Sequence, residues 1–218
     1  MTLFEKILAA RGLSADSVAT FLRPNYPSLH DPFLLPDMEK AVDRLVLARE
    51  HQEHITIYGD YDIDGLTATT VLLDALRSFG FEHVDTFIPN RFVEGYGLTV
   101  DAVEKIASDG AQIILTVDCG SLSHKEITRS NELGVDVIVT DHHNVAAEQP
   151  PAVAVINPKR LLADNPDAYE GYLLKNNSLA TSLYPFLDLA GVGVAFKLVQ
   201  ALQTRLNGLP IGQEKWLL

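Results

Sequence analysis

The stretch HITIYGDYDIDGLTATTVLLDALRSFG, residues 54–80, decides the fold. Its first five residues, His54–Tyr58, carry β-branched and aromatic side chains that predict a buried strand. Three aspartates follow at alternate positions, and apolar residues then recur at helical spacing from Leu66 to Phe79. The stretch therefore predicts a strand, an acidic turn and a helix, in that order.

The same alternation continues along the chain. Further β-branched runs are separated by helical segments, Val100–Ser108 and Ser123–Leu133, which stop at Gly110 and Gly134. Because parallel neighbours need a crossover connection, this order predicts an α/β fold with a doubly wound, mainly parallel, Rossmann-like sheet. The predicted strands are residues 54–58, 84–88, 112–117, 135–140 and 152–156.

The flanking segments suggest the domain organisation. Residues 1–52 predict a helical lead-in that packs on the core, and residues 53–218 predict the α/β domain. Within that domain, residues 161–188 predict a loop or insertion before an apolar helix from Val192 to Leu206. The apolar stripe of the second lead-in helix is formed by Met38, Ala41, Val42, Leu45 and Leu47.

The composition indicates a globular protein. The chain has 218 residues, 47% of them hydrophobic, which is enough for a substantial core. Its single cysteine, Cys119, excludes a disulfide framework and a cysteine-based metal site, and predicts a small buried side chain. The N-terminus lacks a signal-peptide pattern, and no run approaches the roughly 20 apolar residues that span a bilayer. We therefore expect a soluble, cytoplasmic protein without membrane contact.

The charge balance limits the possible partners. Lys and Arg number 17 against 29 Asp and Glu, a net charge of -12, whereas nucleic-acid-binding modules are normally basic. Either the partner is not nucleic acid, or some carboxylates face metal ions while the basic surface lies elsewhere.

Acidic and histidine residues gather at the ends of the predicted strands. In an open parallel sheet, ligands bind beyond the carboxyl ends of the strands. Clustered carboxylates repel one another unless cations neutralise them, and carboxylate and imidazole ligands suit manganese or magnesium. A shared aspartate could bridge two ions about 3.5–4 Å apart, which predicts hydrolytic phosphoryl chemistry. The residues are Asp60, Asp62 and Asp64 after the first strand, Asp118 after the third as the best-placed bridge, and Asp141, His142 and His143 after the fourth.

Each of these residues has a structural alternative. Asp64, before Gly65, could be a helix cap or turn former, and Asp118 could be a cap. A histidine pair could belong to an exposed loop, although its position directly after an apolar strand favours a site. Arg91 could be a solvated charge, or a phosphate contact because it stands next to a glycine-rich turn.

Four motifs resemble those of RecJ-type exonucleases of the DHH phosphoesterase superfamily. They occur in the expected order and the similarity extends from about Asp31 to the end. Tyr58 stands where other superfamily members have a histidine, which points away from the inorganic pyrophosphatase branch. The motifs are Ile57–Ala68, Ile88–Arg91 with Glu94–Leu98, Val117–Gly120 and Asp141–His143, and the segments Asn157–Arg160 and Leu189–Leu198 are also similar.

This resemblance implies a two-metal, manganese- or magnesium-dependent exonuclease that removes nucleotides from the 5′ end of single-stranded DNA in recombination and repair. Single-strand-binding protein or a RecQ-type helicase would be its partners. It implies metal ligands at Asp60, Asp62, Asp64, Asp118 and His142, and catalytic roles for Asp118, Asp141, His142 and His143, with Asp141 orienting the pair. Substrate contacts would come from Arg91, Gly95, Tyr96, Gly97 and His143.

RecJ-like proteins continue beyond the segment that corresponds to residues 214–218. They carry a further metal-binding aspartate, a second α/β domain and a nucleic-acid-binding barrel, so we expect a catalytic fragment with reduced activity alone. Two alternatives remain. One is a DHH phosphoesterase that acts on short oligonucleotides or nucleotides. The other is a catalytically inactive scaffold, against which the intact ligand set argues.

Overall fold

The computed structural model describes residues 2–13, 15–23, 25–92, 95–165 and 184–206 of the chain. They fall into two compact units, within residues 1–30 and 31–218. The first unit contains helices α1 (Leu3–Ala10) and α2 (Ala15–Leu22) and the 3-10 turn η1 (Tyr26–Ser28). A capping box starts α1, because the Thr2 hydroxyl accepts the Glu5 N–H while the Glu5 carboxylate accepts the Thr2 N–H.

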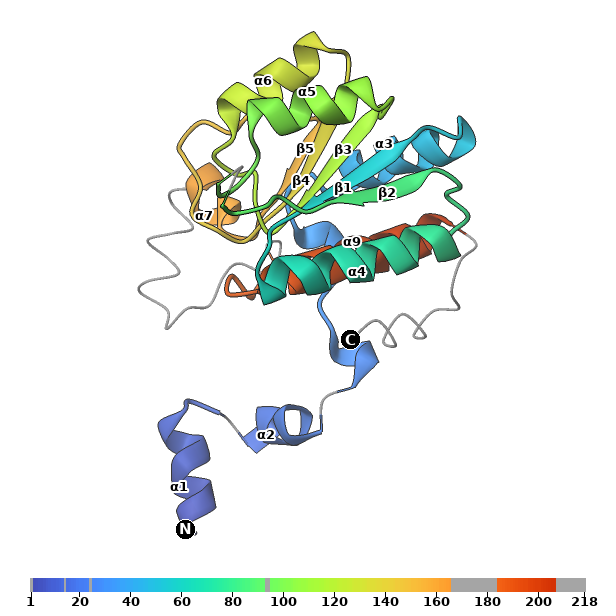
Figure 1. The fold of residues 1–218 in the computed structure, drawn as a ribbon. Helices are drawn as coiled ribbons and strands as arrows, with labels where there is room; N and C mark the ends of the chain where they lie inside the picture. Colours follow the sequence, from blue (N-terminus) through green and yellow to red (C-terminus); the bar gives the residue numbers. More distant parts are fainter. Residues whose placement is uncertain (1, 14, 24, 93–94, 166–183, 207–218) are drawn as a thin grey trace. The chain divides into compact units, whose positions relative to one another are not determined.

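The second unit is built on a five-stranded sheet in which every paired neighbour is parallel (Figure 1). The order β2-β1-β3-β4-β5 confirms the predicted doubly wound fold. The chain passes from β1 to β2 on one side and then to β3 on the other, so the topological switch point lies between β1 and β3. The strands are β1 (Ile55–Gly59), β2 (Val84–Phe87), β3 (Ile113–Val117), β4 (Asp136–Thr140) and β5 (Ala154–Ile156).

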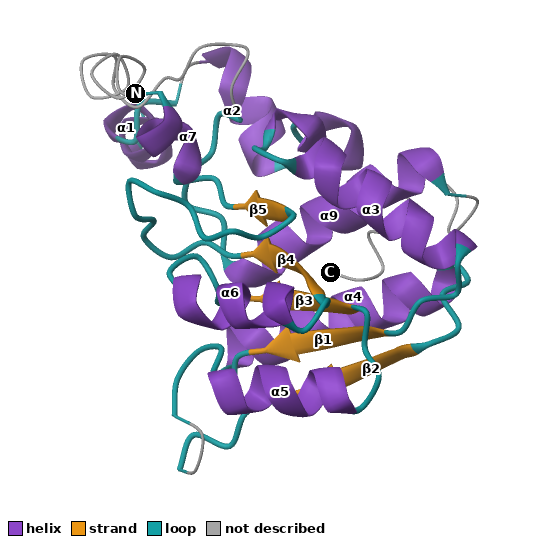
Figure 2. Cartoon of the chain, turned by 90° about the horizontal axis from the view of Figure 1, so that it is seen from above, coloured by secondary structure: helices purple, strands orange, loops and turns teal. Residues whose placement is uncertain are grey.

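Helices cover both faces of this sheet (Figures 1 and 2). Side chains from alternate strand positions enter two separate cores, since Ile113 packs with one set of helices and Ile114 with the other. None of the helices in the described part of the chain has the length and apolar character needed to cross a membrane. On one face lie α5 (Val100–Ser108) and α6 (His124–Glu132); on the other lie α3 (Met38–Glu50), α4 (Ile63–Ser78) and α9 (Gly191–Arg205).

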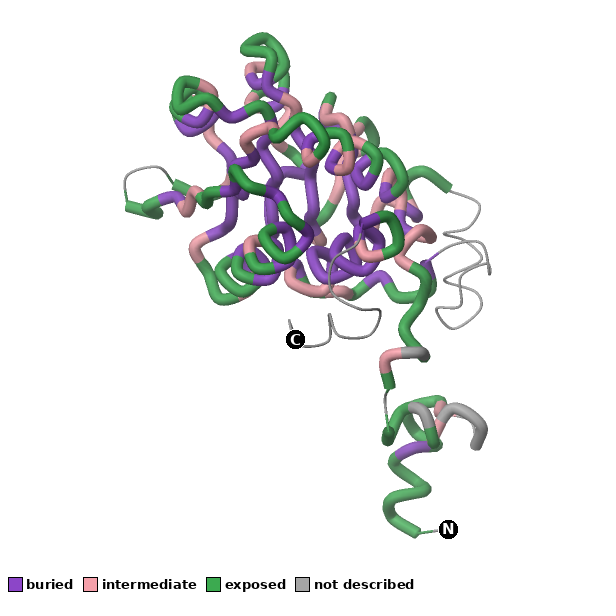
Figure 3. Tube along the Cα trace, turned by 90° about the vertical axis from the view of Figure 1, so that its right-hand side faces the viewer, coloured by how far each residue is buried: buried purple, intermediate pink, exposed green. Residues whose placement is uncertain are grey.

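The buried parts of the chain are concentrated in the strands and the helix faces against them (Figure 3). Both faces of the sheet are covered, so β1 and β3 are buried at every position, as their nearly continuous apolar sequences predict. The aspartates that follow these strands are buried as well, which places charge at the edge of an apolar core.

Two helices differ from the sequence prediction. The helix expected from Leu66 begins at Ile63, because the preceding aspartate, Asp62, supplies its N-cap. In α3, Leu47 is 42% exposed and the prediction for it was wrong. Ala48 is fully buried in its place, since it continues the helical spacing set by Leu45.

The predicted loop of residues 161–188 is partly helical at its start. Helix α7 (Arg160–Asp164) follows β5, with Leu161 buried. Residues 166–183 of this prediction lie outside the described residues. The short 3-10 turn η2 (Pro32–Leu34) precedes α3 and packs near α9, where the Arg205 guanidinium lies 5.9 Å from the Phe33 ring centre.

Candidate metal centre

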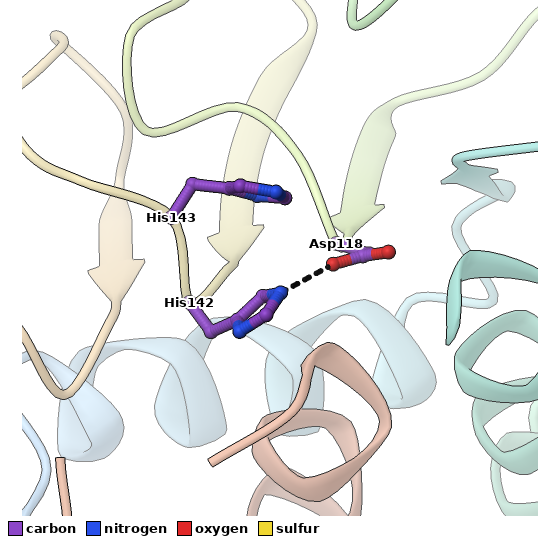
Figure 4. A group of neighbouring side chains, drawn as sticks. All are labelled: Asp118, His142 and His143. Carbon is purple, nitrogen blue, oxygen red and sulfur yellow. Dashed lines mark ion pairs between the residues drawn. The ribbon is translucent and has the colours of Figure 1, made fainter. Parts of the chain in front are cut away.

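The predicted acidic and histidine residues converge at the carboxyl end of the sheet, at the switch point between β1 and β3. Two groups each bring their potential ligand atoms within 4.8 Å of one another. Figure 4 shows one of them, with Asp118 at the end of β3 facing His142 and His143 beside it. Asp118 belongs to both groups, as a bridging ligand would. The groups are Asp60, Asp62 and Asp118, and Asp118, His142 and His143.

The turn between β1 and α4 is shaped by its own aspartates. The Asp62 carboxylate accepts the N–H groups of Asp64 (2.8 Å) and Gly65 (3.0 Å), which starts α4. A Cβ atom at Gly65 would lie 2.5 Å from the Asp60 carbonyl oxygen, so only glycine lets the helix approach this closely. Asp60 is thereby held at the sheet edge with 3% exposure, and burial, together with the charge of Asp62, raises its pKa.

The backbone at Asp118 adopts a conformation that few non-glycine residues tolerate. Its φ is 61°, in the left-handed region, and Gly120 follows with φ 111°. The Thr116 hydroxyl donates to the Cys119 carbonyl oxygen over 2.8 Å and fixes the turn, in which Cys119 is buried as predicted. Such backbone strain is typical of functional sites.

The Asp118 carboxylate is buried without adequate compensation from the protein. Its Oδ1 lies 3.0 Å from Nε2 of His142 yet accepts no hydrogen bond. Burial, reinforced by the negative charges of Asp64 and Asp62, raises the pKa of Asp118 to about 7. A buried acceptor surrounded by like charges is what a cation site presents before the cation binds, and these oxygen and nitrogen donors suit manganese or magnesium.

Asp141 has a different environment, although it is also 1% exposed. Its Oδ1 accepts the His142 N–H (2.7 Å) and lies 2.8 Å from Nδ1 of His143, while Oδ2 accepts the Ser121 N–H (3.0 Å). Burial alone would raise the pKa of Asp141, but the hydrogen bonds from His143 and Ser121 outweigh it and lower the pKa to about 2. The same hydrogen bond raises the pKa of His143. Asp141 therefore orients His143, with its Nε2 directed away from this carboxylate.

Asp64 connects the site to a distant helix. Its carboxylate accepts the N–H groups of Gly191 (2.7 Å) and Val192 (2.8 Å), 127 and 128 residues away, at the start of α9. The same side chain lies 3.6 Å from Nε2 of His142. Asp64 is thus a helix cap, which the sequence left open, but for α9 and not for α4.

Gly191 and Asn157 complete the site and were missed as site residues. A Cβ atom at Gly191 would lie 2.6 Å from Oδ1 of Asp118, so α9 can start there only with glycine. The fully buried Asn157 amide donates to the Ser121 hydroxyl and the His143 carbonyl oxygen, both at 2.9 Å. Asn157 directly follows β5, so a search for polar residues after every predicted strand would have found it. The only sequence signal for Gly191 was its position in the segment Leu189–Leu198, which resembles RecJ-type exonucleases.

The predicted substrate residues lie along one side of the site. Tyr96 is 58% exposed, and its hydroxyl lies 3.4 Å from Nε2 of His143. The exposed Arg91 guanidinium stands 4.6 Å from the centre of the Tyr61 ring, and that ring meets Tyr96 edge to face. Arg91 therefore contacts Tyr61 of this aromatic pair and is exposed to solvent.

Glycines allow the connection between β2 and α5 to turn back over the sheet. Gly95 and Gly97 have φ values of 83° and 76°, which side-chain-bearing residues rarely adopt. The Tyr58 hydroxyl donates to the Gly97 carbonyl oxygen over 2.8 Å and ties this connection to β1. Glu94, part of the same predicted motif, lies outside the described residues.

Comparison with known proteins places this geometry in context. Residues 54–216 match the model described as the DHH family, N-terminal domain. The single-stranded-DNA-specific exonuclease RecJ of Bacillus subtilis (strain 168) is 40% identical over 92% of this chain and 23% of its own length. The protein of the same name from Escherichia coli (strain K12) is 37% identical over 94% of the chain and 32% of its own length. The chain thus spans about a quarter to a third of these relatives.

The solved structures that resemble this chain include RecJ exonucleases as well. A crystal structure of exonuclease RecJ bound to manganese superposes with a TM-score of 0.66 at 35% identity, covering 84% of this chain and 41% of that one. The structure of RecJ in complex with Mn2+ from Thermus thermophilus gives a TM-score of 0.68 at 29% identity, covering 96% of this chain and 26% of that one.

Proposed function

This chain belongs to the DHH family, and we propose that it is the catalytic part of a RecJ-type exonuclease that hydrolyses single-stranded DNA with manganese or magnesium. Residues 53–218 form the catalytic domain in this proposal. The names of the relatives support the substrate, since those proteins are single-stranded-DNA-specific exonucleases.

One observation carries the proposal: the shared position of Asp118 in two groups of potential ligands, with its buried Oδ1 accepting no hydrogen bond. Asp60, Asp62 and His142 would hold metal ions together with Asp118, and Asp64 would join them beside His142. Two bound ions would supply the positive charge that neutralises the oxygens of a phosphodiester.

The other side chains of the site bind and orient the substrate. Asp141 holds His143 and favours its protonated form, so Nε2 of His143 can donate a hydrogen bond to a phosphate oxygen. Arg91 would attract the DNA backbone, and Tyr96 offers an aromatic face for a base. These roles fit the position of the three residues on one side of the ligand cluster.

Several finer points rest on the resemblance of the four motifs. They are digestion from the 5′ end, a role in recombination and repair, a cytoplasmic location, and partners such as single-strand-binding protein or a RecQ-type helicase. A manganese-dependent activity that starts from the 3′ end would refute the first of these and leave the hydrolase proposal standing.

The proposal is tested with the protein that carries this chain and a 5′-phosphorylated single-stranded oligonucleotide. Manganese-dependent release of mononucleotides is expected, and the pair of substitutions Asp118→Ala and His142→Ala should abolish it. A matched control changes the exposed Asp74 and His83 to alanine, because neither lies at the sheet edge that carries the cluster. Full activity in the Asp118/His142 variant, or an equal loss in the control, would overturn the proposal. Competition between long strands and dinucleotides separates it from a small-substrate phosphoesterase.

A further inference from the structure

A cavity of about 270 Å³ opens next to the candidate metal centre. It lies between the connection from β2 to α5 and the connection from β3 to α6, and it includes the first turn of α6. His143 lines the cavity and also belongs to one of the two groups of potential metal ligands, so the cavity adjoins the metal centre. The lining also includes Leu122 and Glu126, to which neither the motifs nor the proposed function assigns a role.

The charges around the cavity favour a neutral ligand group. Its lining contains the carboxylates of Glu126 and Asp141 and the His143 imidazole, which is paired with Asp141, and no lysine or arginine occurs among the described lining residues. Glu126 also stands in the first turn of α6, where it offsets the positive end of that helix. Next to Glu126 a phosphate group would be repelled, whereas a nucleoside without its phosphate would not.

The walls offer apolar surface at the right place for a nucleobase. Leu122 is 61% exposed and Tyr96 58% exposed, although both are large apolar or aromatic side chains beside a polar site. Bases stack on aromatic side chains such as Tyr96 without regard to sequence, and an apolar side chain such as Leu122 can pack against the face of a base. The volume is just under the roughly 300–1,000 Å³ of typical small-molecule sites, which suits a single nucleoside.

We propose that this cavity binds the nucleoside attached directly to the scissile phosphate. The base lies against Leu122 and Tyr96, and the Glu126 carboxylate accepts hydrogen bonds from N–H groups of the base. The phosphate remains outside, at Nε2 of His143. This inference rests on the proposed function, because it assumes that the phosphodiester of a DNA strand is bound at the metal centre.

The test compares 5′-labelled single-stranded oligonucleotides in which a tetrahydrofuran abasic unit replaces nucleotide 1, 2 or 5 from the 5′ end. Release of the first nucleotide is followed with manganese. For the unsubstituted protein, loss of the base at position 1 or 2 should raise KM about tenfold with little change in kcat, and loss at position 5 should not. Leu122→Ala should raise KM about tenfold on the intact strand. On the strand whose missing base, at position 1 or 2, raises KM for the unsubstituted protein, Leu122→Ala should cause no further increase.

Two control variants separate this effect from a general disturbance. Leu122→Met keeps an apolar side chain of similar volume and should restore KM to within about twofold of the original value. Leu133→Ala removes another exposed leucine, 39% exposed at the far end of α6, and should leave KM unchanged on every strand.

Equal KM values for the intact strand and the strands abasic at positions 1 and 2 would overturn the inference. So would Leu122→Ala raising KM by the same factor with and without the base. If the protein releases no nucleotide from any strand with manganese, the proposed function fails instead. In that case, calorimetry with 2′-deoxyadenosine tests whether the cavity binds a nucleoside. Binding that Leu122→Ala weakens supports the inference, whereas absent binding, or binding that Leu122→Ala does not change, refutes it.

Discussion

The turns after β3 and β4 each begin with a buried aspartate, Asp118 and Asp141, and both side chains are 1% exposed. Their pKa values nevertheless move in opposite directions, to about 7 and about 2. Asp141 accepts hydrogen bonds from N–H groups of Ser121 and His142, whereas Oδ1 of Asp118 accepts none. Burial alone therefore does not decide how a strand-end carboxylate behaves. The protein itself supplies the hydrogen bonds that Asp141 needs, whereas in our proposal a bound cation would compensate Asp118.

The largest effect should come from Asp118→Asn. Removing the charge at the shared ligand should lower manganese-dependent nucleotide release by at least about 10²–10³-fold, since electrostatic stabilisation of the phosphodiester is lost. The Tm should rise by a few degrees, because asparagine tolerates the left-handed backbone and repulsion from Asp64 ends. Asp74→Asn on the exposed face of α4 is the control for both measurements. A fall in Tm for Asp118→Asn would contradict the claim that the buried Asp118 carboxylate destabilises the metal-free protein.

The pH dependence of stability should distinguish the same two residues. A carboxyl whose pKa is raised on folding binds its proton more tightly in the folded state, so Asp118 makes the metal-free protein less stable as pH rises from about 4 to about 7. The slope approaches about 1.4 kcal/mol per pH unit. Asp141 has a lowered pKa and stabilises the fold above about pH 4, and this contribution is lost as pH falls toward 2.

Urea unfolding with EDTA at pH 4–8 measures this difference. The stability of Asp118→Asn minus that of the unsubstituted protein should increase from pH 4 to about pH 7 and then level off. A difference that stays constant would show that Asp118 ionises normally in the folded protein.

Manganese should offset the loss of folding stability that the charged Asp118 carboxylate causes, and it should not change the stabilisation that Asp141 provides. An ion that binds only the folded state stabilises it by about 2.7 kcal/mol at a concentration of 100 times its Kd. Thermal unfolding with and without manganese should show this gain in the unsubstituted protein and lose most of it in Asp118→Asn. An equal gain in both proteins would place the ion elsewhere than at Asp118.

Asp141→Asn should destabilise the protein where Asp118→Asn stabilises it. An asparagine amide next to the N–H groups of Ser121 and His142 leaves donors unpaired, at a cost of about 1–3 kcal/mol. Activity should fall by about 10–100-fold, because His143 loses the carboxylate that orients it. Urea unfolding measures the loss of stability, and manganese-dependent nucleotide release measures the loss of activity. Unchanged stability of Asp141→Asn would contradict the conclusion that hydrogen bonds to Asp141 stabilise the fold.

The sequence predicted which residues meet at the sheet edge but not how they differ. Strand ends are readable because β-branched runs mark the strands, and a parallel sheet brings their carboxyl ends to one edge. Asp118 and Asp141 look alike by this rule. What separates them is the φ of 61° at Asp118 and the Ser121 N–H at Asp141, both of which depend on how the turn after β3 folds.

The docking of α9 was equally beyond the sequence. Its helical pattern predicted the helix to within a residue at each end, but no periodicity states which carboxylate will cap a helix 127 residues away. Gly191 is required by the proximity of Asp118, a constraint that exists only in the folded protein. The sequence therefore predicted the helix itself, whereas it did not predict the contacts of that helix with residues far away in the chain.

The smallest expected effect concerns Asp64, which combines features of the two aspartates compared above. Like Asp141 it accepts backbone N–H groups, from Gly191 and Val192, and like Asp118 it lies beside His142. Asp64→Ala should cost about 1 kcal/mol through the lost cap and speed amide hydrogen exchange at the start of α9. Asp64→Asn should give intermediate exchange, because its single amide oxygen can accept only one of the two N–H groups that the Asp64 carboxylate accepts, and it should weaken manganese binding through the lost charge. If both variants leave exchange slow and only manganese binding suffers, Asp64 acts like Asp118 alone and its cap is incidental.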